Sequence, residues 1–543
     1  MRVADLNANV SVRQPASCAI HGTDTIARMR PRSFLVAAVA FSMLAVACGS
    51  DGGVTITSSD TIGEGNVSPD GPSTGPSTGP STGPSTGSTD ESIEWEDFGD
   101  GLQTGSVVVP IDYDDPSKGD FDLFVLRRPA SDPSKRIGSL LVNPGGPGFG
   151  GAVFAQIAES IYSPELLDHF DIVGWDPRGT GLSTPAIDCI DDYDPYFATE
   201  YNGLTDEEVK AKSVEVAMDF ERECADNNSE IIQYVGTNNS ARDMDMIRQA
   251  LGEEEITYFG FSYGSELGAT WATLFPDTVR AAVLDGATDP DADAVQSSID
   301  QSKGFEASLN TFLAQCSDDV DCAFHNNGDA EGAYDALIAS LNENPIPSDP
   351  DRPDVESGVA ISAVIQAMYS ESLWPQLAQA LSDAQANDGS GLLALYDSYY
   401  QRLPDGTYDN SLEAFQVISC ADTPERLTVK EEDADAYLYE EAAPRLYGDS
   451  EGGSYFCTFF PPSLDPRATI TGAGAGPILV VGTTGDPATP LASSRNMAKA
   501  LEDGVLLVVD ADQHTGYDVN DCSTGTVDAY LIDLDVPADG TEC

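Results

Sequence analysis

Short, strongly apolar runs recur through the chain, and their composition is typical of buried β-strands. Several are continuous rather than alternating, as expected of strands that are covered on both faces. Stretches with helical spacing separate the later runs, which indicates βαβ units and a mostly parallel sheet flanked by helices. The pattern therefore predicts an α/β fold with an eight-stranded sheet, its strands at Ser106–Pro110, Phe121–Arg127, Gly138–Asn143, Phe170–Trp175, Ile256–Phe261, Arg280–Asp285, Pro477–Gly482 and Val505–Asp510.

Between Asp285 and about Pro466 the pattern changes from strands to helices. Helical spacing is clearest over Ala360–Ala384, and no series of strands accompanies it. We interpret this region as a large, mainly helical lid that is inserted after the sixth core strand. The expected divisions are core residues 94–290, lid residues 291–465 and core residues 466–543.

Residues 1–47 have the pattern of a removable signal peptide or leader. Three arginines at positions 28–32 precede the apolar run 34–47, which is too short to span a membrane comfortably. Cys48 resembles the lipidated cysteine of a bacterial lipoprotein, with ordinary signal-peptide cleavage as the alternative, and Met29 is an alternative start. We expect an extracytoplasmic protein held to the cell membrane only through a lipid on Cys48, or else a secreted one.

Residues 48–93 carry almost no apolar pattern, and a Gly-Pro-Ser-Thr unit repeats within Gly71–Gly87. Proline and glycine at this density cannot form a packed core. We interpret this segment as a disordered linker that separates the anchor from the folded part.

The formal net charge is −65, from 91 acidic and 26 basic residues. Phosphate binding needs clustered lysine and arginine, so this balance argues against nucleic acid as a partner. The acidic residues are spread along the chain, which indicates a well-solvated surface, with adaptation to a salty habitat as a further interpretation.

Eight cysteines remain when Cys18 and Cys48 are left aside, and an even number in an exported protein suggests disulfides. Pairing in sequence order is the simplest hypothesis, although many connectivities are open. Cys-x-x-Cys pairs with histidine at zinc-finger spacing do not occur, so we expect no metal and no other cofactor. The eight are Cys189, Cys224, Cys316, Cys322, Cys420, Cys457, Cys522 and Cys543.

Gly260-Phe-Ser262-Tyr-Gly264 lies between the predicted strand Ile256–Phe261 and a helical pattern at Glu266–Leu274. Gly-x-Ser-x-Gly occurs six times in the chain, but the other five copies lack a preceding strand and a following apolar helix. A serine on a tight turn between strand and helix exposes its hydroxyl above the sheet. Ser262 is therefore the candidate nucleophile.

A serine nucleophile needs a base, and histidine fits that role. The chain has four histidines: His21 in the leader, His169 just before a predicted strand, His325 in the lid, and His514. His514 follows the carboxyl end of a predicted strand, where the active sites of parallel sheets lie. We expect it to act as the general base.

Asp486 lies in the loop after the predicted strand Pro477–Gly482, one strand–helix–strand unit before His514. This spacing puts both side chains on adjacent loops at one edge of the sheet. With Ser262 they form the expected catalytic triad, in the chain order Ser, Asp, His. Thr489 either hydrogen-bonds within this loop and holds Asp486, or caps the next helix.

Asn143-Pro-Gly-Gly146-Pro-Gly-Phe-Gly-Gly151 follows another predicted strand. Its glycines allow backbone N–H groups to approach a substrate, so we expect the amides of Gly146 and Tyr263 to form an oxyanion hole. A phosphate loop is excluded because its Gly-Lys-Ser/Thr and Rossmann patterns are absent. Asp176 and Arg178, after the strand that ends at Trp175, are expected to pair with each other and to support the site loops.

These motifs occur together in one known family. The loop from Asn143, Phe170–Gly179, Thr237–Asp243, Gly260–Gly264 and Gly485–Pro490 resemble the secreted tripeptidyl-aminopeptidase-like branch of the α/β-hydrolases, which is related to the proline iminopeptidases. The resemblance extends from about Trp95 to Cys543 and includes the C-terminal segment of that branch. It implies the α/β-hydrolase fold and the release of short peptides from the N-terminus of peptides or proteins.

Three hypotheses for the function follow. The first is an exported serine aminopeptidase that works through an acyl-enzyme, and the second is an esterase for small esters with the same triad. The third is a surface lipoprotein that binds peptides without cleaving them. The intact triad and the oxyanion loop argue against the third.

Overall fold

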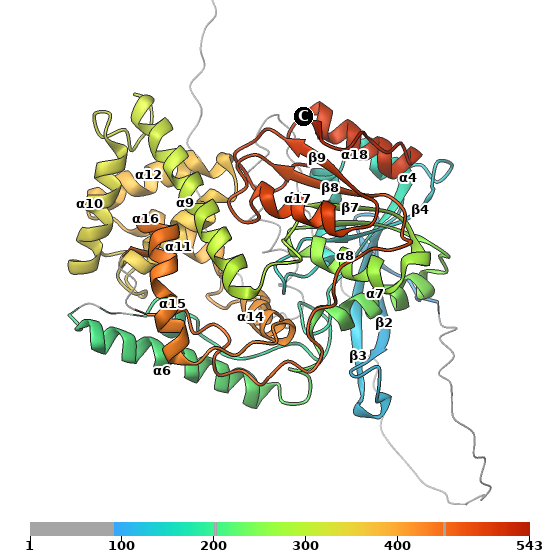
Figure 1. Ribbon diagram of the computed structural model, residues 1–543, viewed down its shortest axis with the longest axis horizontal. Coiled ribbons are helices and arrows are strands. Elements are labelled where there is room, and N and C mark those ends of the chain that lie inside the picture. Colours follow the sequence, from blue (N-terminus) through green and yellow to red (C-terminus); the bar gives the residue numbers. More distant parts are fainter. Residues whose placement is uncertain (1–91, 200, 202, 449–451) are drawn as a thin grey trace, which may run out of the picture.

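The computed structural model describes residues 92–543 except residues 200, 202 and 449–451 (Figure 1). The leader, Cys48 and the linker as far as residue 91 lie outside the described residues. The predicted end of the linker at residue 93 is wrong, because Ile93 is buried in the core and its N–H donates to the carbonyl of Ala250. Among the helices that are described, none combines the length and the apolar character needed to cross a membrane.

A single mixed sheet forms the centre of the core, in the order β1-β2-β3-β5-β4-β6-β7-β8-β9-β10. The pairs from β1 to β5 are antiparallel, and all pairs from β5 to β10 are parallel. The strands are β1 (Glu96–Gly99), β2 (Leu102–Pro110), β3 (Asp120–Arg128), β4 (Gly138–Asn143), β5 (Phe170–Trp175), β6 (Ile256–Phe261), β7 (Val279–Asp285), β8 (Ile478–Thr483), β9 (Gly504–Val509) and β10 (Thr541–Glu542).

All eight predicted strands are present, but the predicted number is wrong because the sheet has two further edge strands. β1 is exposed along its whole length, and β10 has only two residues, so neither leaves an apolar pattern in the sequence. The central strands β4, β5, β6 and β8 are buried at every position, which explains their continuous apolar runs.

Helices cover both faces of the sheet and create two apolar cores. Neighbouring residues of β4 point to opposite cores: Leu141 packs with one, and Leu140 and Val142 pack with the other. The first core includes residues of α7 (Thr237–Leu251), α8 (Tyr263–Leu274) and α17 (Leu491–Ala500). The second includes residues of α2 (Ala152–Gln156), α3 (Ala158–Ile161), α4 (Pro164–His169) and α18 (Asp521–Asp533).

The helices between β7 and β8 form the lid, a lobe beside the sheet with an apolar core of its own (Figure 1). The predicted helical stretch Ala360–Ala384 is two helices, because a short turn at Glu371–Leu373 interrupts it and Pro375 lies in the first turn of the second. The lid helices are α9 (Ala294–Asp318), α10 (Ala330–Glu343), α11 (Ser357–Met368), α12 (Trp374–Gln385), α13 (Ser390–Tyr399), α14 (Ser411–Asp422), α15 (Val429–Ala442) and α16 (Pro444–Tyr447).

A second segment, between β5 and α7, also joins the lid. It carries α5 (Asp194–Phe197) and the long α6 (Asp206–Asn227), and Figure 1 shows α6 running along the lid. Arg352 of the lid binds Asp194 in this segment at 2.8 Å and Asp397 of α13 at 2.8 Å. The sequence pattern alone placed this segment with the core, because its docking depends on such long-range contacts.

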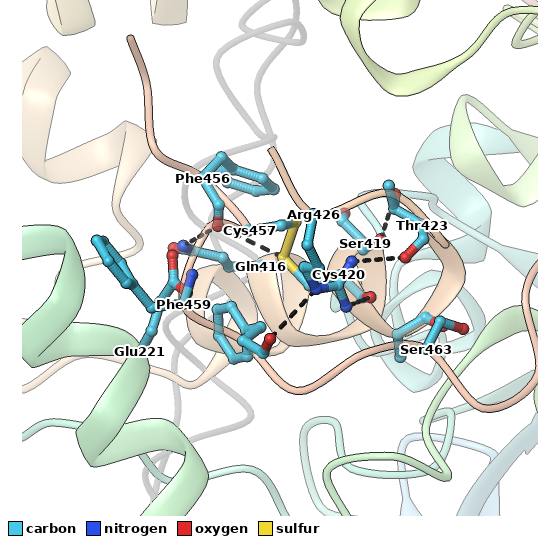
Figure 2. The surroundings of a disulfide bond; sticks show 12 residues. Glu221, Gln416, Ser419, Cys420, Thr423, Arg426, Phe456, Cys457, Phe459 and Ser463 are labelled. Atoms are coloured by element: carbon cyan, nitrogen blue, oxygen red, sulfur yellow. Dashed lines mark hydrogen bonds between the residues drawn. A yellow bond between two sulfur atoms is a disulfide. The ribbon is translucent and has the colours of Figure 1, made fainter. Parts of the chain in front are cut away.

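In the part of the chain that the structure describes, four disulfides join the eight cysteines in sequence order: Cys189–Cys224, Cys316–Cys322, Cys420–Cys457 and Cys522–Cys543. Figure 2 shows the Cys420–Cys457 bond, which ties α14 to the segment that returns from the lid to β8. Arg426 donates to the carbonyls of Phe460 and Pro461 in the same segment. The return path of the chain is therefore fixed by covalent and polar contacts together.

Candidate active site

The candidate nucleophile lies on a sharp turn between β6 and α8. Ser262 has φ 54° and ψ −125°, a conformation that non-glycine residues rarely adopt, and its side chain stays partly accessible. A Cβ on Gly260 would lie 2.2 Å from the carbonyl oxygen of Gly264, and a Cβ on Gly264 would lie 2.9 Å from that of Asn143. Both glycines are therefore required by close backbone packing beneath the exposed serine.

The structure brings Asp486 and His514 into direct contact. Nδ1 of His514 lies 2.9 Å from both carboxylate oxygens of Asp486, whose side chain is fully buried. Within its own loop, Asp486 accepts hydrogen bonds from the amides of Ala488 and Thr489, at 2.9 and 2.8 Å, and from Oγ1 of Thr489 at 3.1 Å. Pro490 is the N-cap residue of α17, so Thr489 holds Asp486 and does not cap the helix.

The electrostatics of His514 suit a base that is charged during the reaction. Burial alone lowers the pKa of His514, but the charge and hydrogen bond of Asp486, aided by the charge of Asp285, outweigh it and raise the pKa above 6.5. Nε2 of His514 is buried and has no hydrogen-bond partner in the described part of the chain. The second ring nitrogen is thus free to take a proton.

Asp285 connects the serine and histidine loops, and the sequence patterns did not single it out. Its backbone carbonyl accepts the N–H of Ser262 at 2.8 Å, and its buried carboxylate accepts the amides of Gly516 and Tyr517 at 2.8 Å each. A Cβ on the next residue, Gly286, would lie 2.9 Å from Cε1 of His514. Ser262 and His514 therefore flank the same corner at the carboxyl end of β7. The sequence does offer a signal for Asp285. It is the last residue of β7, and Asp486 lies at the corresponding end of the neighbouring strand β8.

The predicted oxyanion loop lies against the serine turn. A Cβ on Gly145 would lie 2.9 Å from Cβ of Ser262 and 3.1 Å from the amide nitrogen of Tyr263. That amide is the first in α8, where an N–H has no partner within its own helix. On the other side of the loop, Gly148 packs against the backbone of α14 in the lid. Tyr263 and the residue after Gly145, Gly146, are thus placed near the nucleophile.

The predicted pairing of Asp176 with Arg178 is wrong. Arg178 is fully buried and forms a bidentate ion pair with Asp243 of α7, with one nitrogen–oxygen distance of 2.7 Å. Asp176 instead accepts the amides of Leu182 and Ala152, at 2.8 and 3.1 Å. Asp176 thus holds Ala152, the residue after the glycine loop, whereas Arg178 also donates to the carbonyls of Pro110, Ile111 and Tyr234. The long Arg178 side chain reaches past its neighbours, and one acidic partner cannot be selected from many by sequence spacing.

The other two described histidines lie away from this site. Nδ1 of His169, at the end of α4, contacts the carbonyl of Glu165 at 2.8 Å. Nδ1 of His325 contacts the carbonyl of Cys316 in the lid at 3.0 Å. Each serves its local backbone, which leaves His514 as the histidine beside Ser262.

Comparison with known proteins agrees with the fold. A family model described as the alpha/beta hydrolase fold matches residues 138–521. The serine protease Hip1 of Mycobacterium tuberculosis is 37% identical over 469 residues, which cover 82% of this chain and 87% of the relative. Carboxylesterase B of the same organism is 34% identical over 454 residues, covering 81% and 85%. A tripeptidyl aminopeptidase of Streptomyces coelicolor is 30% identical over 463 residues, covering 81% and 84%.

Proposed function

Since the chain belongs to the family of proteins with the alpha/beta hydrolase fold, we propose that it is an exported serine aminopeptidase that releases short peptides from the N-terminus of its substrates. It is a serine hydrolase, as its relatives among the serine proteases and tripeptidyl aminopeptidases indicate. The Asp486–His514 pair, whose Nε2 has no partner among the described residues, supports the hydrolytic chemistry together with the strained turn of Ser262. The similarity to a tripeptidyl aminopeptidase supports the choice of substrate.

The proposed reaction proceeds through an acyl-enzyme. His514 takes the proton of Ser262 as the hydroxyl attacks the scissile carbonyl, and Asp486 orients the imidazole and stabilises its charged form. The amides of Tyr263 and Gly146 donate to the oxyanion of the tetrahedral intermediate. His514 then gives its proton to the leaving amine, and water releases the N-terminal peptide from Ser262 by the same steps.

A second candidate is the hydrolysis of small esters, which the similarity to a carboxylesterase favours and which uses the same residues. A peptide with a free N-terminus and its N-acetylated twin separate the two, because an aminopeptidase must recognise the ammonium group. We expect the free peptide to be cleaved and the acetylated one to be spared, with Ser262→Ala inactive on both. Equal turnover of the two peptides would refute the aminopeptidase proposal.

We also propose that the mature protein is anchored outside the cytoplasm through a lipid on Cys48. Four disulfides in the described chain support an oxidising compartment. Cys48→Ala should move the protein from the membrane fraction to the soluble extracytoplasmic fraction. If the variant stays in the membrane fraction, the anchor is not at this residue.

A further inference from the structure

The lid contacts the loop that holds the acid of the proposed triad. Nε2 of Gln301, on α9, donates to the carbonyl of Ala488 at 3.1 Å. One turn further along α9, Gly304 lies against the carbonyl of Pro487, the residue before Ala488. A Cβ on Gly304 would be 2.3 Å from that carbonyl oxygen. Helix α9 is therefore seated on the backbone of the Asp486 loop at van der Waals distance.

The lid also contacts the histidine itself. Tyr369 is the C-cap residue that follows α11, and its carbonyl accepts the backbone N–H of His514 at 3.1 Å. Its ring meets the imidazole edge to face, with centroids 5.7 Å apart and an interplanar angle of 71°. Phe305 of α9 packs against the same tyrosine ring at 5.3 Å. The contacts on the acid loop and on the histidine are thus joined through adjacent residues of α9, Gly304 and Phe305.

We propose that Tyr369 is a positioning residue for His514 and that α9, through Gln301 and Gly304, positions the Asp486 loop, so that the seated lid sets the geometry of the acid–base pair. The inference rests on the proposed role of this pair in the reaction. Asp486 and His514 are carried by separate loops at the edge of the sheet. The lid touches both loops, through the side chain of Gln301 and the backbone of Gly304 on the acid loop, and through the carbonyl and ring of Tyr369 on His514.

The geometry matters because catalysis by a triad tolerates little displacement. A misplacement of about 1 Å can slow an enzyme by about 100-fold. A methyl group at Gly304 cannot be accommodated without moving either α9 or the carbonyl of Pro487, since both nearest atoms are backbone. A shift of α9 would carry Phe305 with it and loosen the packing on Tyr369.

The test compares two alanine substitutions in lid helices. Gly304→Ala introduces the clash, whereas Gly358→Ala is the matched control, because a Cβ on Gly358 of α11 meets nothing within 4 Å. The readout is the rate at which a fluorophosphonate labels Ser262, which requires the base but no peptide recognition. We expect Gly304→Ala to label roughly 10- to 100-fold more slowly than wild type, and Gly358→Ala to label at the wild-type rate. Equal rates for all three proteins would overturn the inference.

The same assay separates this inference from the proposed function. If wild-type Ser262 is not labelled at all, the proposed catalytic role fails, and the inference fails with it. If wild type is labelled but cleaves acetylated and free peptides equally, the aminopeptidase proposal fails, while the comparison of the two glycine variants still decides the role of the lid.

A second set of variants keeps the test independent of folding. The groups that face His514 are the carboxylates of Asp486 and Asp285 and the ring of Tyr369. Tyr369→Ala removes the ring and exposes the imidazole of His514 to water. Because burial lowers the pKa of this histidine, the substitution should raise that pKa. The fall in labelling rate on the acid side of the pH profile should therefore move to higher pH. Tyr369→Phe keeps the ring and should restore the wild-type limb. A purely structural role would lower the labelled fraction without moving the limb, and that result would overturn the proposal.

Discussion

Replacing Thr489 by valine tests how the acid of the proposed triad is held. Asp486 accepts three hydrogen bonds within its own loop, two from backbone amides and one from Oγ1 of Thr489. The single hydroxyl proton of Thr489 goes to Asp486, at 3.1 Å, rather than to Nδ1 of His514, which is 3.4 Å away and is itself a donor to Asp486. Valine keeps the shape of threonine and removes only this donor.

The size of the effect follows from what remains. A hydrogen bond to a charged group contributes about 1.5–3 kcal/mol, but both backbone donors and His514 still bind the carboxylate. We therefore expect a loss at the low end, about 1.5 kcal/mol in the activation free energy, which is roughly tenfold in kcat. KM should not change, because Thr489 contacts Asp486 and the histidine rather than substrate.

The assay is steady-state cleavage of a free-amine peptide by wild type and by Thr489→Val, with Thr489→Ser as the control. Serine retains the hydroxyl and should keep most of the rate. A Thr489→Val enzyme with wild-type kcat would show that the two backbone amides suffice to hold Asp486. A rise in KM at constant kcat would place Thr489 in substrate binding and refute the reasoning as well.

Two further predictions concern stability. Arg178→Met leaves the buried carboxylate of Asp243 without its bidentate partner, so the free energy of unfolding in urea should fall by about 3–5 kcal/mol; a smaller loss would mean that Asp243 is readily neutralised. Burial raises the pKa of Glu413 from 4.5 to about 7, although the amides of Cys189 and Ile190 stabilise its charge. Because the folded state holds this proton more tightly than the unfolded state, the contribution of Glu413 to stability is fully present below about pH 4.5 and is lost as pH rises through about 7. The free energy of unfolding of Glu413→Gln should therefore fall less steeply over this range than that of the wild type, and an unchanged slope would exclude a contribution from Glu413.

The fold and the family resemblance were predictable from the sequence and are confirmed. The buried parallel strands leave long apolar runs, and the rule that parallel strands present their carboxyl ends at one edge places Ser262, Asp486 and His514 together. The pairing of Arg178 with Asp243 was not predicted, although Asp243 lies in the motif Thr237–Asp243. The choice among so many acidic residues required three-dimensional packing.

The lid was predictable as an insertion but not as a part of the site. Helical spacing reports which face of a helix is apolar, and it does not report what that face meets. Tyr369 contacts His514 through a backbone carbonyl, which every residue has, and Gly304 matters only because a carbonyl of another loop lies against it. Contacts of this kind have no residue signature.

The lid reaches the site from several directions, and this bears on how such an enzyme controls its reaction. At one end, α14 packs on Gly148 of the oxyanion loop, and Asp422, the last residue of α14, accepts the hydroxyl of Thr237 at 2.6 Å. That hydroxyl in turn contacts the phenol of Tyr263, whose amide is a proposed oxyanion donor. At the other end, α9 and Tyr369 cover the acid–base pair. An insertion that contacts both the proposed oxyanion donors and the acid–base pair cannot be exchanged as an independent substrate-binding module. Replacing it would also remove the contacts that hold these groups in place. We therefore expect the lids of enzymes built in this way to change specificity through residues that line the substrate, while the helix ends that contact the catalytic loops keep their geometry.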